Sequence, residues 1–97
     1  MTSSAMQTIQ TISTEFHLSQ ETIIQESLKV FLEKKLREIK ADIFKIYGKY
    51  RVTSVEALES CFEKGLIEEK DALDDYHKLD HLEFKRDEIS KILLELQ

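Results

Sequence analysis

The sequence predicts an all-α protein built as a long antiparallel helical hairpin, and two observations carry this prediction. Apolar residues recur three and four positions apart through most of the 97 residues, which is the periodicity of amphipathic helices. Proline is absent and glycine occurs only twice, so little in the chain interrupts a helix. We expect a single helical domain over residues 1–97, because a chain of this length supports one small core.

The first two predicted helices occupy the N-terminal half. Residues 1–18 contain a short helix with apolar residues at helical spacing, namely Ala5, Ile9, Ile12 and Phe16. Ser19 is a favourable N-cap for a long helix over residues 19–51. The apolar residues of this long helix alternate in steps of four and three, as in a coiled-coil seam: Leu32, Leu36, Ile39, Ile43, Ile46 and Tyr50.

Two more helices follow. A short connecting helix is predicted over residues 53–65, with Thr53 and Glu56 at the spacing of a capping box. Gly65 is placed to end it in the left-handed conformation. A second long helix is predicted over residues 68–97, and it continues the seam with Leu79, Leu82, Ile89 and Leu93.

The two long helices have similar lengths and opposite charge, which favours antiparallel packing. Residues 33–51 carry seven basic and three acidic side chains, whereas residues 52–97 carry six basic and thirteen acidic ones. Two helices alone bury little surface, so we expect a homodimer that closes a four-helix bundle. The alternative is a monomer in which the N-terminal helix folds over the groove between the long helices.

Composition excludes several classes of protein. One cysteine rules out a disulfide scaffold. No run of roughly 18 apolar residues is present for a membrane span, and the first residues lack the basic start and apolar block of a secretory signal. We therefore expect a cytoplasmic protein without membrane contact. The formal net charge of −5 also disfavours nonspecific nucleic-acid binding.

Nothing in the chain has the pattern of an active site. A glycine-rich phosphate loop and a Ser/His/Asp arrangement are both missing, so we expect no enzyme, no catalytic residue and no cofactor. His77 and His81 are four residues apart and could share a metal ion, but a structural site needs four good ligands, so we predict no metal. Cys61 is interpreted as a small buried hydrophobic residue.

The first two helices could also form a helix-turn-helix around His17, Leu18 and Ser19. Such a unit would present Ser19, Gln20 and Thr22 to DNA, and basic residues further along would contact phosphate: Lys34, Lys35, Arg37 and Lys40. The second helix is much longer than a recognition helix, and residues 1–32 are net negative. Nucleic-acid binding therefore stays possible but is not favoured.

Acidic residues gather at the start of the last helix. They are Glu68, Glu69, Asp71, Asp74 and Asp75, with Tyr76 beside them. Acids in a first turn interact favourably with the helix dipole, which explains them without any function. A compatible functional interpretation is an acidic patch that covers a basic surface of a partner.

Two stretches carry a family resemblance. FLEKKLREIKADIFKIYGKYRVTSVEALESCFEKGLIEE at residues 31–69 and DDYHKLDHLEF at residues 74–84 resemble small helical proteins of archaea and cyanobacteria identified as antitoxin-like. Those proteins are encoded beside a small toxin, often assigned as a ribonuclease. The family tends to have glycine where this chain has Arg51, and often has a tryptophan in the acidic segment where this chain has none.

The resemblance implies a non-enzymatic protein that binds and neutralises a cognate toxin. The acidic helical surface would then be the partner-binding site, with Glu68, Glu69, Asp71, Asp74, Asp75 and Tyr76 as its residues. Electrostatic attraction to a basic nuclease face would make association fast and sensitive to salt. Two alternatives stay open, a dimeric coiled-coil structural or assembly protein and a DNA-binding autorepressor.

Overall fold

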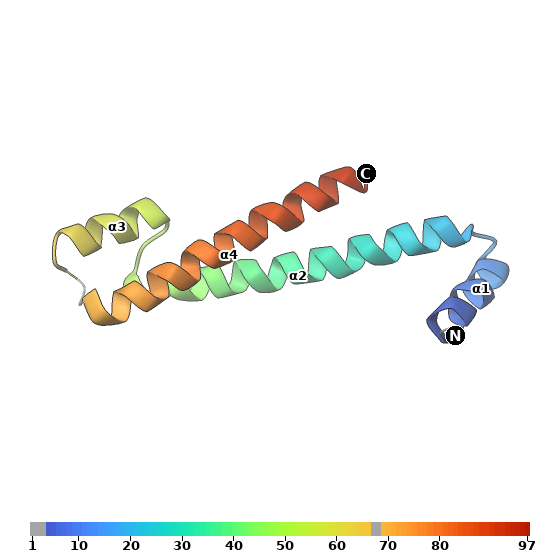
Figure 1. The fold of residues 1–97 in the computed structure, drawn as a ribbon, viewed down its shortest axis with the longest axis horizontal. Coiled ribbons are helices and arrows are strands. Elements are labelled where there is room, and N and C mark those ends of the chain that lie inside the picture. Colours follow the sequence, from blue (N-terminus) through green and yellow to red (C-terminus); the bar gives the residue numbers. More distant parts are fainter. Residues whose placement is uncertain (1–3, 67–68) are drawn as a thin grey trace.

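The computed structural model describes residues 4–66 and 69–97, except for the side chains of Glu69 and Asp71. This part of the chain forms four helices and no strand (Figure 1). The helices are α1 (Ser4–Phe16), α2 (Gln20–Tyr50), α3 (Val55–Glu63) and α4 (Glu69–Glu95). Each lies within its predicted range, so the all-α prediction is confirmed.

The long helices α2 and α4 pack antiparallel and form the body of the molecule. In the view of Figure 1 they overlap near the α3 end and are seen side by side toward the C terminus, while α1 lies beyond the end of α4. The molecule is accordingly elongated, with extents of 62 × 27 × 18 Å. α1 packs against the start of α2, where Ile23 is buried, and does not fold along the groove between the long helices.

The buried core lies at the α3 end of the hairpin. Leu58 of α3 and Leu79 of α4 are fully buried, and they pack with Ile43 and Ile46 of α2. Burying a side chain of this size stabilises the fold by about 1.5–3 kcal/mol. Around this core lie partly buried residues from three helices and the loop before α3: Ile39, Tyr47, Tyr50, Val52, Val55, Tyr76 and Leu82.

The seam positions of α2 and α4 differ in how well they are covered. Ile43, Ile46 and Leu79 are buried. The other predicted seam residues are only half-buried: Leu32, Leu36, Ile39, Tyr50, Leu82, Ile89 and Leu93.

Side-chain hydrogen bonds also link α2 to α4 and to the residues that follow α4. The Tyr47 hydroxyl donates to Oε1 of Glu83 at 2.9 Å, and Nε2 of Gln25 donates to the carbonyl oxygen of Leu96 at 2.7 Å. Burial, with the hydrogen bond to Glu83 as a second cause, raises the pKa of Tyr47 to about 12. The hydroxyl therefore stays protonated as a donor at neutral pH.

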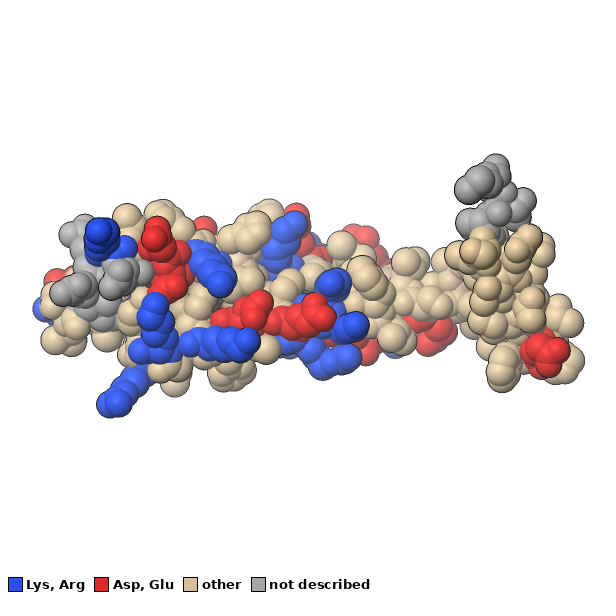
Figure 2. Space-filling model, turned by 90° about the horizontal axis from the view of Figure 1, so that it is seen from below, with Lys and Arg blue, Asp and Glu red and all other residues tan. Residues whose placement is uncertain are grey.

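Charged side chains of both signs cover the hairpin. Figure 2 shows Lys and Arg interspersed with Asp and Glu over the α2 side, whereas the α1 end is nearly free of charge. Several opposite charges are close enough to pair, including Lys35 with Glu38 at 3.5 Å. Within the described residues, no helix is both long enough and apolar enough to cross a membrane.

Each of the first three helices ends at a residue in the left-handed conformation. These residues are His17 with φ 57°, Arg51 with φ 55° and Gly65 with φ 68°. After α3, Leu66 N–H donates to the Cys61 carbonyl and Gly65 N–H to the Phe62 carbonyl, which is a Schellman motif. The predicted role of Gly65 is confirmed.

The start of α3 differs by one residue from the prediction. Ser54, not Thr53, is the N-cap, because the extended backbone of Ser54 places its hydroxyl where it accepts from the Ala57 N–H at 3.1 Å. The capping box predicted for Thr53 and Glu56 is therefore wrong. Ser19 caps α2 as predicted and accepts from the Thr22 N–H at 3.0 Å.

The left-handed Arg51 generates a prediction about stability. A side chain with a Cβ atom costs about 1–2 kcal/mol in this conformation, and glycine avoids most of that cost. We expect Arg51→Gly to raise the free energy of unfolding by about 1 kcal/mol in a denaturant titration. Arg51→Ala is the control, because it removes the exposed arginine chain but keeps the Cβ. An equal gain in both variants would contradict backbone strain as the cause.

Candidate interaction site between α3 and α4

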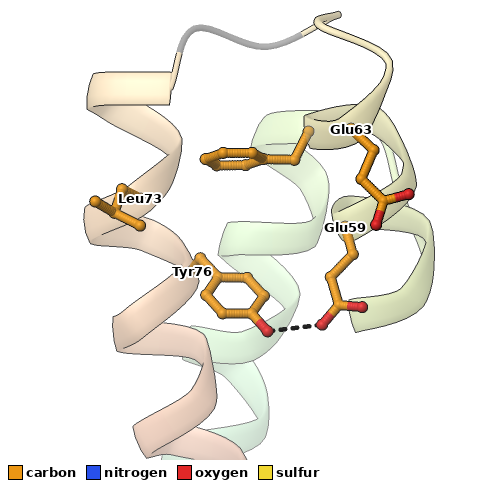
Figure 3. Close-up of a pocket in the computed structure, with 5 residues that line it drawn as sticks. Glu59, Glu63, Leu73 and Tyr76 are labelled. Carbon is orange, nitrogen blue, oxygen red and sulfur yellow. Dashed lines mark hydrogen bonds between the residues drawn. The ribbon is translucent and has the colours of Figure 1, made fainter.

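A shallow hollow lies between α3 and the start of α4. It measures about 210 Å³ and is lined by Glu59, Phe62 and Glu63 of α3 and by Leu73 and Tyr76 of α4 (Figure 3). The Tyr76 hydroxyl donates to Oε1 of Glu59 at 2.6 Å and ties the two helices together. The hollow is smaller than the roughly 300–1,000 Å³ of typical small-molecule pockets. Its size suits one side chain of a partner protein.

Two carboxylates line this hollow, and two more lie further along α4. The pKa of Tyr76 is raised, first by its hydrogen bond to Glu59 and then by the negative charges of Glu59, Asp80 and Glu83. Glu63 lies one turn from Glu59 on α3, at the edge of the hollow. We call these four carboxylates, Glu59, Glu63, Asp80 and Glu83, the acidic face. In the described part of the chain, no lysine or arginine forms an ion pair with them.

The hollow and the acidic face together present an apolar floor with negative charge at its edge. Phe62 and Leu73 supply the apolar part, and Leu73 is 44% exposed. A lysine or arginine side chain has the matching form, an aliphatic stem with a cationic end. The apolar floor can contact such a stem while the carboxylates attract its cationic end.

A second cluster joins α4 to the end of α2. Lys49 Nζ lies 2.6 Å from Oδ2 of Asp75, and the Tyr50 hydroxyl donates to the same oxygen. The hydrogen bonds from Lys49 and Tyr50 lower the pKa of Asp75. This ion pair connects the basic segment with the acidic C-terminal half, as the charge distribution predicted. It also means that Asp75 is already neutralised within the chain.

The predicted partner-binding residues that the structure describes have different surroundings and do not form one patch. Asp74 is exposed, Asp75 is engaged by Lys49 and Tyr50, and Tyr76 bonds Glu59. Glu68 and the side chains of Glu69 and Asp71 lie outside the described residues. No observation decides whether these six residues bind a partner, so that role stays a prediction.

Two of the other residues singled out in the sequence adjoin this site. The His77 ring lies edge-on to the Tyr76 ring, with 6.1 Å between their centroids, and His77 and His81 line a shallow hollow with Asp80 and Glu83. His77 and His81 are exposed on α4, and the described residues contain no group of three or more His, Cys, Asp or Glu able to hold a metal ion. Cys61 is half-buried on α3. The hydroxyls of Ser19 and Thr22 bond each other at 2.7 Å at the start of α2.

Sequence reasoning missed the contribution of α3 to the site. A signal was present, because Glu59 and Glu63 are like charges four residues apart on one short helix, which costs helix stability. The position of Phe62 between them would have placed an apolar side chain on the same side. The spacing within α3 could not predict that Leu73 and Tyr76 of α4 lie next to these residues, because that contact depends on tertiary packing.

Comparison with known proteins identifies the family. The sequence pattern of the uncharacterized protein MJ0235 family matches residues 1–97. The chain belongs to the MJ0235 family. Its relative, the uncharacterized protein MJ0235 of Methanocaldococcus jannaschii, is 31% identical over 77 residues, which cover 79% of this chain and 93% of that protein. No solved structure matches the chain.

Neither the family description nor the name of the relative states an activity or a partner. The antitoxin role implied by the resemblance therefore stays a prediction.

Because the pKa of Asp75 is lowered in the folded chain, its contribution to stability depends on pH. That contribution is complete at a pH above the pKa of Asp75 in the unfolded chain, near 3.8. It is lost as the pH falls through the lower pKa of Asp75 in the folded chain. We expect Asp75→Asn to destabilise the protein at pH 7, with the difference from the natural chain shrinking below pH about 3.8. Denaturant titrations at pH 7 and pH 2.5 measure this, and Asp74→Asn, at an exposed neighbour, should change little at either pH. A difference that is the same at both pH values would show that Asp75 does not act through its charge.

Proposed function

We propose that this MJ0235-family chain is a non-enzymatic, antitoxin-like protein that binds and neutralises a basic partner through the acidic face and the α3–α4 hollow. The observation that supports it most is the uncompensated charge of this face. Three of its carboxylates act on the single hydroxyl of Tyr76, and the apolar floor of Phe62 and Leu73 lies beside them. Negative charge beside an apolar hollow suits recognition of a cationic side chain better than binding of an anion.

The proposed partner is a toxin encoded by a neighbouring gene, and a ribonuclease fits the chemistry. A ribonuclease presents cations to the phosphates of its RNA substrate. Carboxylates held on two helices can form ion pairs with those cationic side chains and so prevent the RNA from binding. Complementary charge also raises the association rate and makes that rate fall with ionic strength.

Charge reversal on the acidic face tests this proposal. Glu63→Lys combined with Asp80→Lys changes two carboxylates while keeping the Tyr76–Glu59 hydrogen bond intact. We expect the association rate with the neighbouring gene's product, measured by stopped flow at low salt, to fall about tenfold or more. The rate of the natural chain should itself fall steeply as salt is raised.

The matched control applies the same charge change at the other end of the molecule. Glu15→Lys combined with Glu26→Lys alters two exposed glutamates on α1 and the start of α2. We expect it to leave the association rate within about twofold. Equal effects of the two double variants would place the interface elsewhere. Failure of the natural chain to bind the neighbouring product, or to relieve its toxicity on co-expression, would refute the proposed function.

A further inference from the structure

The apolar seam is left open over the half of the hairpin that lies away from α3. Near α3, Ile43, Ile46 and Leu79 are buried together with Leu58. Further along, Leu32, Leu36, Ile89 and Leu93 are only half-buried, although α2 and the chain end after α4 stay close enough for the Gln25–Leu96 hydrogen bond. Since α1 lies beyond the end of α4, it does not cover this opening.

Exposed apolar side chains continue the open seam on one side of the hairpin. Ile24, Leu28 and Phe31 of α2 follow each other at helical spacing and are between 39% and 55% exposed. On α4, Ile92 is 44% exposed and lies one turn from the half-buried Leu96. We call Ile24, Leu28, Phe31, Ile92 and Leu96 the apolar stripe.

Helix geometry puts both parts of the apolar stripe on the same side. On α2, Leu28 precedes the seam residue Leu32 by four positions, and on α4, Ile92 precedes Leu96 by four and follows Ile89 by three. Viewed from the N terminus of each helix, the stripe residues are turned in the same direction away from the line of contact between α2 and α4. Because the two helices are antiparallel, this shared direction places both sets of side chains on the same side of the hairpin. The hydrogen bond from Gln25 to the Leu96 carbonyl brings the two ends together.

The amount of exposed surface matches what a dimer buries. The accessible surface of the chain is 7632 Å², whereas a compact chain of 11.4 kDa exposes about 5,800 Å². The radius of gyration is 19.8 Å, against about 12.5 Å for a compact domain of this length. The excess of roughly 1,800 Å² is spread over the whole elongated chain, and it exceeds the about 800 Å² that a stable interface buries on each partner.

We propose that a second copy of this chain docks on the apolar stripe and the open seam, forming a two-fold symmetric four-helix bundle. An isologous contact needs a self-complementary surface, and a stripe that is apolar on both helices meets this requirement. The acidic face stays free in such a dimer. Glu83 and Ile92 are nine residues apart on α4, which is two and a half turns at 3.6 residues per turn, so their side chains point in opposite directions.

The dimer therefore carries two acidic faces on its outer sides. Each could bind a basic partner separately. The inference does not depend on the proposed function, because the apolar stripe would require a second copy whatever the acidic face binds.

Light scattering coupled to size-exclusion chromatography tests the proposal at tens of micromolar protein. The expected mass is twice the chain mass of 11.4 kDa. Two variants place a charge in the interface, Phe31→Glu on α2 and Ile92→Glu on α4, and we expect each to weaken the dimer at least tenfold. Phe44→Glu is the control, because Phe44 is 73% exposed and lies on the opposite side of α2.

The outcomes are distinct. A single-chain mass for the natural protein would overturn the dimer. If either interface variant still forms the dimer, or if Phe44→Glu weakens the dimer equally, the interface does not lie on the apolar stripe. Circular dichroism keeps the result interpretable, because a variant that is monomeric and still helical supports the interface. If one interface variant loses its helicity, the dissociation constant of the other decides.

Discussion

Burial of Leu58 between the two long helices is the contact on which the rest of the structure depends. It is the one fully buried side chain from α3 among the described residues, and it packs with Ile43 and Ile46 of α2 and with Leu79 of α4. This contact fixes the position of α3 against the hairpin. The α3–α4 hollow and the acidic face exist only because α3 is held there, so the candidate site rests on a contact that takes no part in binding.

The two ends of the hairpin differ in how well their apolar side chains are buried. At the α3 end the third helix covers the seam, and Tyr47 and Tyr50 reach across to Glu83 and Asp75. At the far end the seam has no such cover. This difference divides the molecule into one end that is complete within a single chain and one that is suited to a second copy.

Periodicity was sufficient to predict the helices, because burial of one face over many turns leaves a regular pattern in the sequence. Local chemistry was less informative where two residues could do the same task, and Ser54 caps α3 although Thr53 has the same hydroxyl. Left-handed helix ends were predictable at Gly65 but not at His17, where the residue type gives no sign. The acidic face was missed because Glu59 of α3 reaches Tyr76 of α4 only through tertiary packing.

The most direct test of this account is the free energy of unfolding of Leu58→Ala, measured by denaturant titration beside Leu94→Ala. Leu94 is a leucine on α4 that is 69% exposed, so it controls for the loss of the same side chain without burial. The account predicts a loss of about 2–5 kcal/mol for Leu58→Ala and within about 0.5 kcal/mol for Leu94→Ala. Similar small losses in both variants would show that Leu58 does not hold α3 on the hairpin, and the candidate site would lose its structural basis.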